Sequence, residues 1–172
     1  MIIAQHKGIA LMSMLAAVLL GAGASVCAQD KRVVGVSEAV RVEPEGLLIV
    51  ALLDTGASRS SLDARGIRMV DRSGKAWVEF EYHDGEQVTP MARPLVRMAH
   101  VRSAPGVKET RPVVMLHLCI GGVRQEVLVN LTDRSGMRSR MLIGRNFLIA
   151  AKFIVDPALK MTSAPTCSEV SK

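Results

Sequence analysis

The residues best suited to chemistry are Asp54, Thr55 and Gly56, which come directly after the apolar run of residues 47–53. An apolar strand that ends in an aspartate carries a carboxylate into the protein interior, where the charge needs hydrogen-bond donors. The backbone N–H groups of Gly56 and Ala57 and the hydroxyl of Thr55 are close enough in sequence to supply them. A carboxylate held in this way can act as a general acid or base, so this segment is a candidate catalytic loop.

A second segment, far along the chain, is also an apolar run followed by a glycine. Residues 141–143 are an apolar run that ends in Gly144 and Arg145, and a further apolar stretch follows. We expect a short strand at 141–143 that packs beside the Asp54 strand, and a short helix at 145–150. An aspartate in a glycine turn is by itself more often structural than catalytic, and the second segment shifts the balance toward catalysis.

Together these segments resemble the two parts of the active site in retropepsin-like aspartic proteases. The similarity covers residues 33–157 and is strongest to a bacterial group that has also been labelled ATP-dependent zinc protease. That group carries Asp-Thr-Gly-Ala and, later, Leu-Thr-Asp-Arg-Ser-x-Met and Met-Leu-x-Gly-Arg, which stand here at residues 54–57, 131–137 and 141–145. The resemblance implies a mostly β fold, half of an acid-protease β-barrel with one short helix, which dimerises to form its active site.

The resemblance also implies roles for the matching residues. Asp54 would be the catalytic carboxylate, and Thr55 would make a hydroxyl contact across the dimer beneath the two aspartates. Gly56 would hydrogen-bond a carboxylate or the substrate, and Ala57 would contact the substrate. In this family a long hairpin closes over the bound peptide as a flap. Its tip would lie near Pro105 and Gly106, which are therefore candidate substrate-binding residues, and a second candidate flap is the hairpin around residues 84–85.

Behind the catalytic loop, Gly144 and Arg145 would support the site, with Arg145 bracing the loop and the dimer. Retroviral relatives place an acidic residue four positions after the catalytic aspartate, where it pairs with this arginine. Here that position is Ser58, followed by Arg59. The usual ion pair to Arg145 therefore cannot form in the same way.

The number of carboxylates predicts the assembly. Peptide hydrolysis by this chemistry needs two carboxylates that share one proton, and the chain contains one Asp-Thr-Gly. The near matches at residues 71–74 and 133–136 have one extra residue each and are more typical of turns. A second Asp54 must therefore come from a second copy, so we expect a homodimer with its site on the two-fold axis.

Alternating apolar and polar residues predict a succession of strands around these motifs. The run at 47–53 is apolar throughout, which indicates a strand buried on both faces. Two hairpins are predicted, one closed by the turn at residues 71–74 and one by Gly121 and Gly122. The expected strands are residues 33–43, 47–53, 60–62, 67–70, 76–82, 95–102, 112–120, 123–131, 141–143 and 152–157.

The chain divides into three parts by composition. Residues 1–28 have the pattern of a secretory signal peptide, with a short basic start, an apolar run and a small-residue site before Gln29. A retained membrane anchor, or lipidation at Cys27, is the alternative. Residues 29–157 form the protease-like domain, too short for a two-lobed aspartic protease in one chain. Residues 158–172 are rich in Ser, Thr, Pro and Lys, and we expect a flexible tail.

Charge and histidine spacing exclude several functions. The net charge is +6, but the chain has one Trp, one Tyr and no long basic run, which disfavours nucleic-acid binding. Its four histidines stand singly, without the His-Glu-x-x-His pattern of zinc proteases, and no phosphate-binding Gly-x-x-x-x-Gly-Lys is present. We expect no metal, no ATP and no other cofactor.

Two cysteines remain after the signal, Cys119 in an apolar strand and Cys167 in the polar tail. Because their surroundings differ so much, we expect two free thiols, and a single disulfide is the alternative in an oxidising compartment.

These observations predict a periplasmic, homodimeric aspartic endopeptidase that acts on a peptide or protein substrate. The alternative is a non-catalytic module that uses the same cleft to bind a peptide or an envelope component by strand addition. A structural envelope protein that uses only the dimer interface is a third possibility. One sequence does not reveal which peptide is cleaved.

Overall fold

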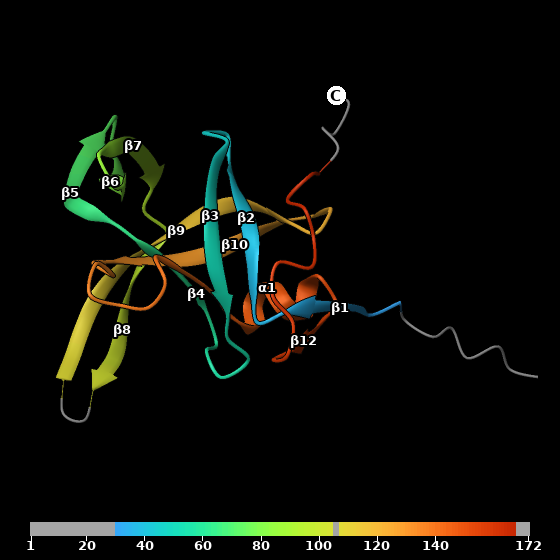
Figure 1. The fold of residues 1–172 in the computed structure, drawn as a ribbon. Coiled ribbons are helices and arrows are strands. Elements are labelled where there is room, and N and C mark those ends of the chain that lie inside the picture. Colours follow the sequence, from blue (N-terminus) through green and yellow to red (C-terminus); the bar gives the residue numbers. More distant parts are fainter. Residues whose placement is uncertain (1–29, 105–106, 168–172) are drawn as a thin grey trace, which may run out of the picture.

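The computed structural model describes residues 30–104 and 107–167, which Figure 1 shows as a ribbon composed mainly of strands. These residues form twelve strands, β1–β12, and one short helix, α1 (Arg145–Ala150). The predicted fold class, mostly β with one short helix, is confirmed. The proposed signal peptide, residues 1–28, lies outside the described residues.

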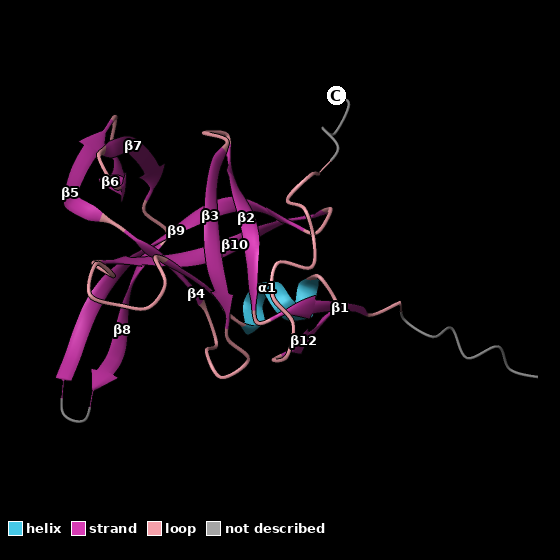
Figure 2. Cartoon of the chain, viewed as in Figure 1, coloured by secondary structure: helices cyan, strands magenta, loops and turns pink. Residues whose placement is uncertain are grey.

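Six strands close into a barrel, whose strands and connecting loops are distinguished by colour in Figure 2. Their order is β10-β4-β11-β3-β2-β9, and β9 pairs with β10 to complete the ring. The pairs β10–β4 and β11–β3 are parallel, and the others are antiparallel. Closure removes the free edges that an open sheet would expose. The six strands are β2 (Ser37–Glu43), β3 (Leu47–Leu53), β4 (Ser60–Asp63), β9 (Val107–Ile120), β10 (Val123–Thr132) and β11 (Met141–Ile143).

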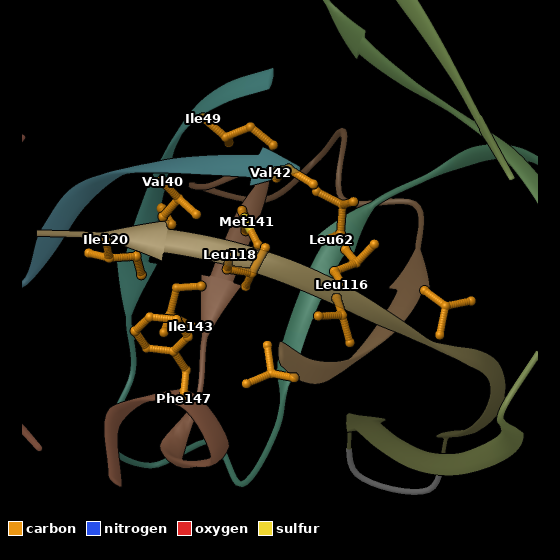
Figure 3. Close-up of a cluster of buried hydrophobic side chains, with 14 of the residues drawn as sticks. Val40, Val42, Ile49, Leu62, Leu116, Leu118, Ile120, Met141, Ile143 and Phe147 are labelled. Carbon is orange, nitrogen blue, oxygen red and sulfur yellow. The ribbon is translucent and has the colours of Figure 1, made fainter. Parts of the chain in front are cut away.

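The barrel encloses a core of aliphatic side chains that alternate along its strands. Figure 3 shows Leu116, Leu118 and Ile120 of β9 extending along this core, and Phe147 of α1 next to Ile143. All five of these side chains are fully buried. Helix α1 therefore packs its aromatic residue against the strand end that precedes Gly144.

The burial of β3 differs from the prediction. Ile49, Ala51 and Leu53 point into the core, but Leu48 and Val50 are each 56% exposed. The expectation that both faces are buried was wrong, because a barrel strand has a single interior face whatever the residues on its other side. An apolar outer face is consequently left on the strand that leads to Asp54.

Strands β8 (Arg97–Ala104) and β9 form the long hairpin that the resemblance relates to a flap, and the predicted Gly121–Gly122 hairpin is confirmed. Strand β8 pairs with β9 and extends the sheet beyond the barrel. The β9–β10 turn has positive φ at Gly121 and Gly122, 55° and 78°, as a two-residue hairpin turn requires. The proposed flap tip, Pro105 and Gly106, lies outside the described residues.

A separate sheet is inserted in the chain between β4 and β8. It contains β5 (Arg65–Arg72), β6 (Lys75–Asp84) and β7 (Gln87–Pro94), and it lies at the upper left of Figure 1, beside the barrel. The predicted turn at residues 71–74 joins β5 to β6, and the Gly74 N–H donates to Asp71 Oδ1 over 2.9 Å. The second candidate flap, around residues 84–85, is the β6–β7 turn of this sheet.

The two terminal strands pair with each other in parallel. They are β1 (Arg32–Gly35) and β12 (Phe153–Asp156). The sequence predicts one strand over residues 33–43, whereas the structure divides it at Val36, because its first part joins β12 and its second part joins the barrel.

Residues 157–167, here named the C-terminal strap, follow β12 and pass along the start of β2 to the β9–β10 turn. The sequence predicts a flexible tail from residue 158, but the strap is held at both backbone and side chain. The buried carboxylate of Glu38 accepts bonds from the N–H and hydroxyl groups of both Thr162 and Ser163. Cys167 forms a disulfide with Cys119, so the expectation of two free thiols was wrong and the alternative is correct. The composition of the tail could not indicate that it is ordered, because Glu38 and Cys119, which hold it, lie far away in the sequence.

We predict that Glu38→Gln lowers the free energy of unfolding at neutral pH by about 1–3 kcal/mol. The glutamine NH2 group would replace a carboxylate oxygen, and it cannot accept the hydrogen bonds that the strap donates. Burial alone would raise the pKa of Glu38, but hydrogen bonds from Thr162, Gly35 and Ser163 hold it below its ordinary value of 4.5. The stabilisation is therefore present above that value and declines as the pH falls through the folded pKa.

Urea unfolding at pH 7 and at about pH 3 checks this prediction, with the exposed Glu86→Gln as the matched control. The difference between wild type and Glu38→Gln should be smaller at the lower pH. An equal gap at both pH values would contradict the role given to the carboxylate.

Candidate active site

The Asp54 loop begins where β3 meets β11. The Asp54 N–H donates to the carbonyl of Ile143 over 2.9 Å, which ties the end of β3 to the end of β11. Its half-buried carboxylate accepts bonds through Oδ1 from the N–H groups of Gly56, 2.8 Å, and Ala57, 3.2 Å. The sequence predicted these two donors. A carboxylate held by the backbone of its own loop has a fixed orientation and keeps Oδ2 available for chemistry.

Arg145 holds the loop from the other side. Its Nη1 donates to the carbonyls of Thr55, 3.0 Å, and Gly56, 2.8 Å, and its backbone N–H donates to Ala57 O over 2.9 Å. The loop carbonyls face the guanidinium, while two loop amides face Asp54. In place of an ion pair to a loop acid, Arg145 bonds the loop backbone.

Gly144 is where the loop and the β11 turn touch. A Cβ at this position would lie 2.5 Å from the carbonyl carbon of Arg59. The Gly144 N–H donates to Ser60 Oγ over 3.1 Å, so the contact is also hydrogen-bonded. Glycine is required here by the close approach of two backbones.

A polar cluster that the sequence did not single out supports this contact. Asn146 Oδ1 accepts bonds from both the N–H and the hydroxyl of Ser60, each over 3.0 Å. Its Nδ2 donates to Leu128 O, and Asn130 Nδ2 donates to Ser60 O. The cluster links α1, β4 and β10 next to the Asp54 loop. In the sequence, this cluster could have been suspected only from the position of Ser60 just after the loop and of Asn146 at the start of the expected helix.

A pocket of about 560 Å³ opens beside the loop, between residues 57–59 and strand β8. Four arginines from separate segments line it, and we call it the arginine pocket. No carboxylate is among the described residues that form its wall, so the pocket is strongly cationic. The lining arginines are Arg59, Arg97, Arg111 and Arg134, and they are joined by Ala57, Ser58, Ser61, Ala99, His100, Val101, Asn130 and Leu142.

Arg111 is held almost completely buried, with 7% exposure. Its Nη2 donates to Glu109 Oε2 over 2.6 Å and its Nη1 to Asn130 Oδ1 over 3.3 Å. The bond from Arg111, opposed by burial and helped by Thr132, keeps the pKa of Glu109 below its ordinary value. Among the described residues, neither Arg111 Nε nor Arg97 Nη2 has an acceptor. The guanidinium donors in this wall exceed the acceptors that the described residues provide.

Arg134 connects the pocket to the Asp54 loop electrostatically. Burial and the neighbouring Arg111 lower the pKa of Arg134, and the carboxylates of Asp63 and Asp54 partly offset that effect. Its backbone N–H and Arg140 Nη1 each donate over 2.6 Å to the fully buried Asp63. The motif at 131–137 thus positions a buried arginine near the Asp54 loop.

The structure brings together Asp54, Gly56, Ala57 and Arg145, with Thr55 exposed at the outer side of the loop. Within residues 30–104 and 107–167, no three His, Cys, Asp or Glu side chains are grouped as a metal site would require. In the same part of the chain, no helix has the length and hydropathy to cross a membrane.

The comparison with protein families agrees with this geometry. The family described as "Retropepsin-like aspartic endopeptidase RimB" matches residues 33–166. The chain belongs to this RimB-like family. The predicted family is confirmed, and it is a family of enzymes by its description.

Relatives of this RimB-like chain include proteins with a different name. A protein from Desulfotalea psychrophila, named "Probable alpha-L-glutamate ligase", is 32% identical over 147 residues, or 83% of this chain and 31% of that protein. One of the same name from Parasynechococcus marenigrum is 34% identical over 132 residues, covering 74% of this chain and 28% of that one. The chain therefore spans less than a third of the length of these two relatives.

A solved structure shares the RimB-like fold. The crystal structure of a protein of unknown function from Legionella pneumophila superposes with a TM-score of 0.69 at 28% sequence identity. The match covers 77% of this chain and 98% of that one. Almost all of that protein thus has a counterpart in the fold of this chain.

We predict that Gly144→Ala destabilises the protein by about 1–3 kcal/mol, because the added methyl group must displace the backbone of Arg59. The matched control is Gly136→Ala, where an added Cβ meets nothing within 4 Å. That change should alter the free energy of unfolding by less than about 0.5 kcal/mol. Urea unfolding measures both, and equal effects would contradict the close contact.

Proposed function

We propose that this protein is a homodimeric aspartic endopeptidase whose catalytic groups are the Asp54 carboxylates of two copies. The observation that carries the proposal is the position of Asp54, half-buried at the end of β3 with Oδ1 held by two loop amides. Membership of a family described as retropepsin-like aspartic endopeptidases supports the same chemistry.

In the proposed reaction, one Asp54 carboxylate takes a proton from a water molecule, which attacks the carbonyl carbon of the scissile peptide. The other Asp54, protonated, donates its proton to the carbonyl oxygen. The two carboxyl groups share one proton because like charges at short distance oppose double ionisation. Activity should then follow a bell-shaped pH profile that belongs to the pair.

A second copy would bring the loops together. Thr55 is exposed on the outer side of the loop, where the same residue of a partner can meet it. Val33 of β1 and Ile154 of β12 are paired in register and are 55% and 47% exposed, which supplies apolar surface for association. Both features support a two-fold interface at the loop and the terminal strands.

For the substrate we propose a peptide rich in glutamate. The arginine pocket begins at Ala57, whose N–H holds Asp54, so a peptide bound at Asp54 would place side chains near these guanidinium groups. Arginine forks match carboxylates in charge and shape. Relatives named glutamate ligases point to the same amino acid. We also propose that the protein acts in the periplasm, which the Cys119–Cys167 disulfide supports.

Replacing Asp54 by Asn should abolish peptide cleavage and leave a folded dimer, because the amide fills the same space but cannot accept the proton. Cleavage of a peptide library from acid to neutral pH by wild type and variant tests this, and analytical ultracentrifugation checks the dimer. Retained cleavage by the variant would refute the mechanism. Binding without cleavage by the wild type would favour the peptide-binding module instead.

The arginine pocket predicts substrate preference. Arg97→Ala should raise KM for a glutamate-rich peptide about tenfold, equivalent to about 1.4 kcal/mol, and affect an uncharged peptide much less. The preference should also weaken with added salt. The control is Arg138→Ala, an exposed arginine outside the pocket. Equal effects of both variants, or equal loss on both peptides, would contradict the pocket's role.

A further inference from the structure

The C-terminal strap forms a short ladder with the chain at the start of β2. Val36 N–H donates to Leu159 O and Met161 N–H donates to Ser37 O, each over 2.8 Å. The strap thus occupies backbone groups of residues 36–37 that no barrel strand uses. It behaves as an additional, short partner of this segment.

Beyond the ladder, side chains and a covalent bond fix the strap. Glu38, fully buried, accepts from the Thr162 and Ser163 N–H groups over 3.0 and 3.1 Å. The strap then passes the β9–β10 turn and ends at Cys167, which is bonded to the fully buried Cys119 of β9. The disulfide is the one covalent tether that the described strap makes to the barrel.

The same segment also holds the strand end that carries the catalytic aspartate. Leu53 N–H donates to the carbonyl of Val36 over 2.8 Å, and Asp54 follows at once. The two backbone groups of Val36 therefore face opposite ways, with its N–H bound to Leu159 of the strap and its carbonyl bound to Leu53. A chain of contacts leads from the disulfide through the strap to the Asp54 loop.

We propose that the Cys119–Cys167 disulfide is a redox latch that keeps the strap on residues 36–38 and thereby orders the end of β3 that carries Asp54. In the oxidised protein the strap is fixed and the Asp54 loop is set. In the reduced protein the strap separates from β2, Val36 loses a bonding partner, and the loop becomes less ordered. As a control of catalysis, the latch rests on the proposed function.

The chemistry is thiol–disulfide exchange with a dithiol or disulfide partner. On opening, a thiolate of a dithiol reductant attacks Cys167 Sγ, and Cys119 leaves as a thiolate that takes a proton. The reductant's second thiol then releases Cys167 as a thiol and forms the reductant's own disulfide. Two electrons and two protons pass to the protein. Closing is the reverse, with a disulfide as the oxidant, so a chain exported into an oxidising compartment would acquire its latch there.

The geometry favours attack at one of the two sulfurs. Cys119 is fully buried within β9, whereas Cys167 is half-buried at the end of the strap. A protein reductant can reach Cys167 more easily, and the strap is the part that moves when the bond opens.

Amide hydrogen exchange of the purified protein tests the latch in three states: oxidised, reduced with dithiothreitol, and reoxidised with glutathione disulfide. Reduction should speed exchange at least about tenfold at Met161, Thr162 and Ser163, and also at Leu53 and Asp54. Reoxidation should reverse both changes. The Phe80 amide, in the separate β5–β7 sheet, should stay unchanged, whereas general destabilisation would speed it too.

The double variant Cys119→Ala with Cys167→Ala should resemble the reduced state and ignore the redox reagents. Continued protection of the strap after reduction would overturn the proposal. So would a released strap with unchanged exchange at Leu53 and Asp54. Because exchange needs no turnover, the expected pattern in a protein that cleaves no peptide would refute the endopeptidase proposal and leave the latch standing. Peptide cleavage that falls and recovers with the redox state would support both.

Discussion

Three carboxylates, Asp54, Glu38 and Asp63, obtain their donors from segments that would otherwise be loose, and this need for donors organises the structure around the barrel. Asp54 takes two amides of its own loop, Glu38 takes the C-terminal strap, and Asp63 takes Arg140 and the backbone of residue 134. A charge in a dry interior is costly unless it is bonded. Each carboxylate therefore fixes a loop at the outside of a barrel whose core is otherwise aliphatic.

The Asp54 loop shows how much of this order is supplied by the backbone. Two strands that end side by side, β3 and β11, bring the loop and the start of α1 together. Arg145 then binds loop carbonyls while Asp54 binds loop amides, so opposite charges hold opposite ends of the same peptide dipoles. Because Gly144 lies at the contact, no side chain separates the loop from the β11 turn. The Asp54 carboxylate is therefore oriented by the backbone of its own loop.

The surroundings of the Asp54 loop include a strongly cationic region, the arginine pocket. Arginines converge on the pocket beside it, and Arg111 and Arg134 are there nearly completely buried. Burying a guanidinium is unfavourable, and Glu109 and Asn130 compensate only part of it at Arg111. Retaining such a costly arrangement is typical of a site that recognises an anion, which agrees with the proposed acidic substrate.

The sequence predicted the features that depend on local pattern. The Asp-Thr-Gly loop, the turn at residues 71–74, the Gly121–Gly122 hairpin and the short helix are each specified by neighbouring residues, and the family resemblance related the distant halves of the site. It did not predict features made by segments far apart. Apolar residues on both sides of β3 concealed its single buried face, four arginines gave no sign of convergence, and Cys167 stood in a polar stretch with nothing to indicate Cys119.

The central claim is that one active site uses Asp54 from two copies, and subunit mixing tests it most directly. Wild-type protein and Asp54→Asn protein are mixed in varied ratio at constant total concentration, allowed to exchange subunits, and assayed for peptide cleavage. If both carboxylates are required, activity falls as the square of the wild-type fraction, to about one quarter in an equal mixture. A fall in direct proportion to that fraction would show that each copy acts alone and would contradict the account.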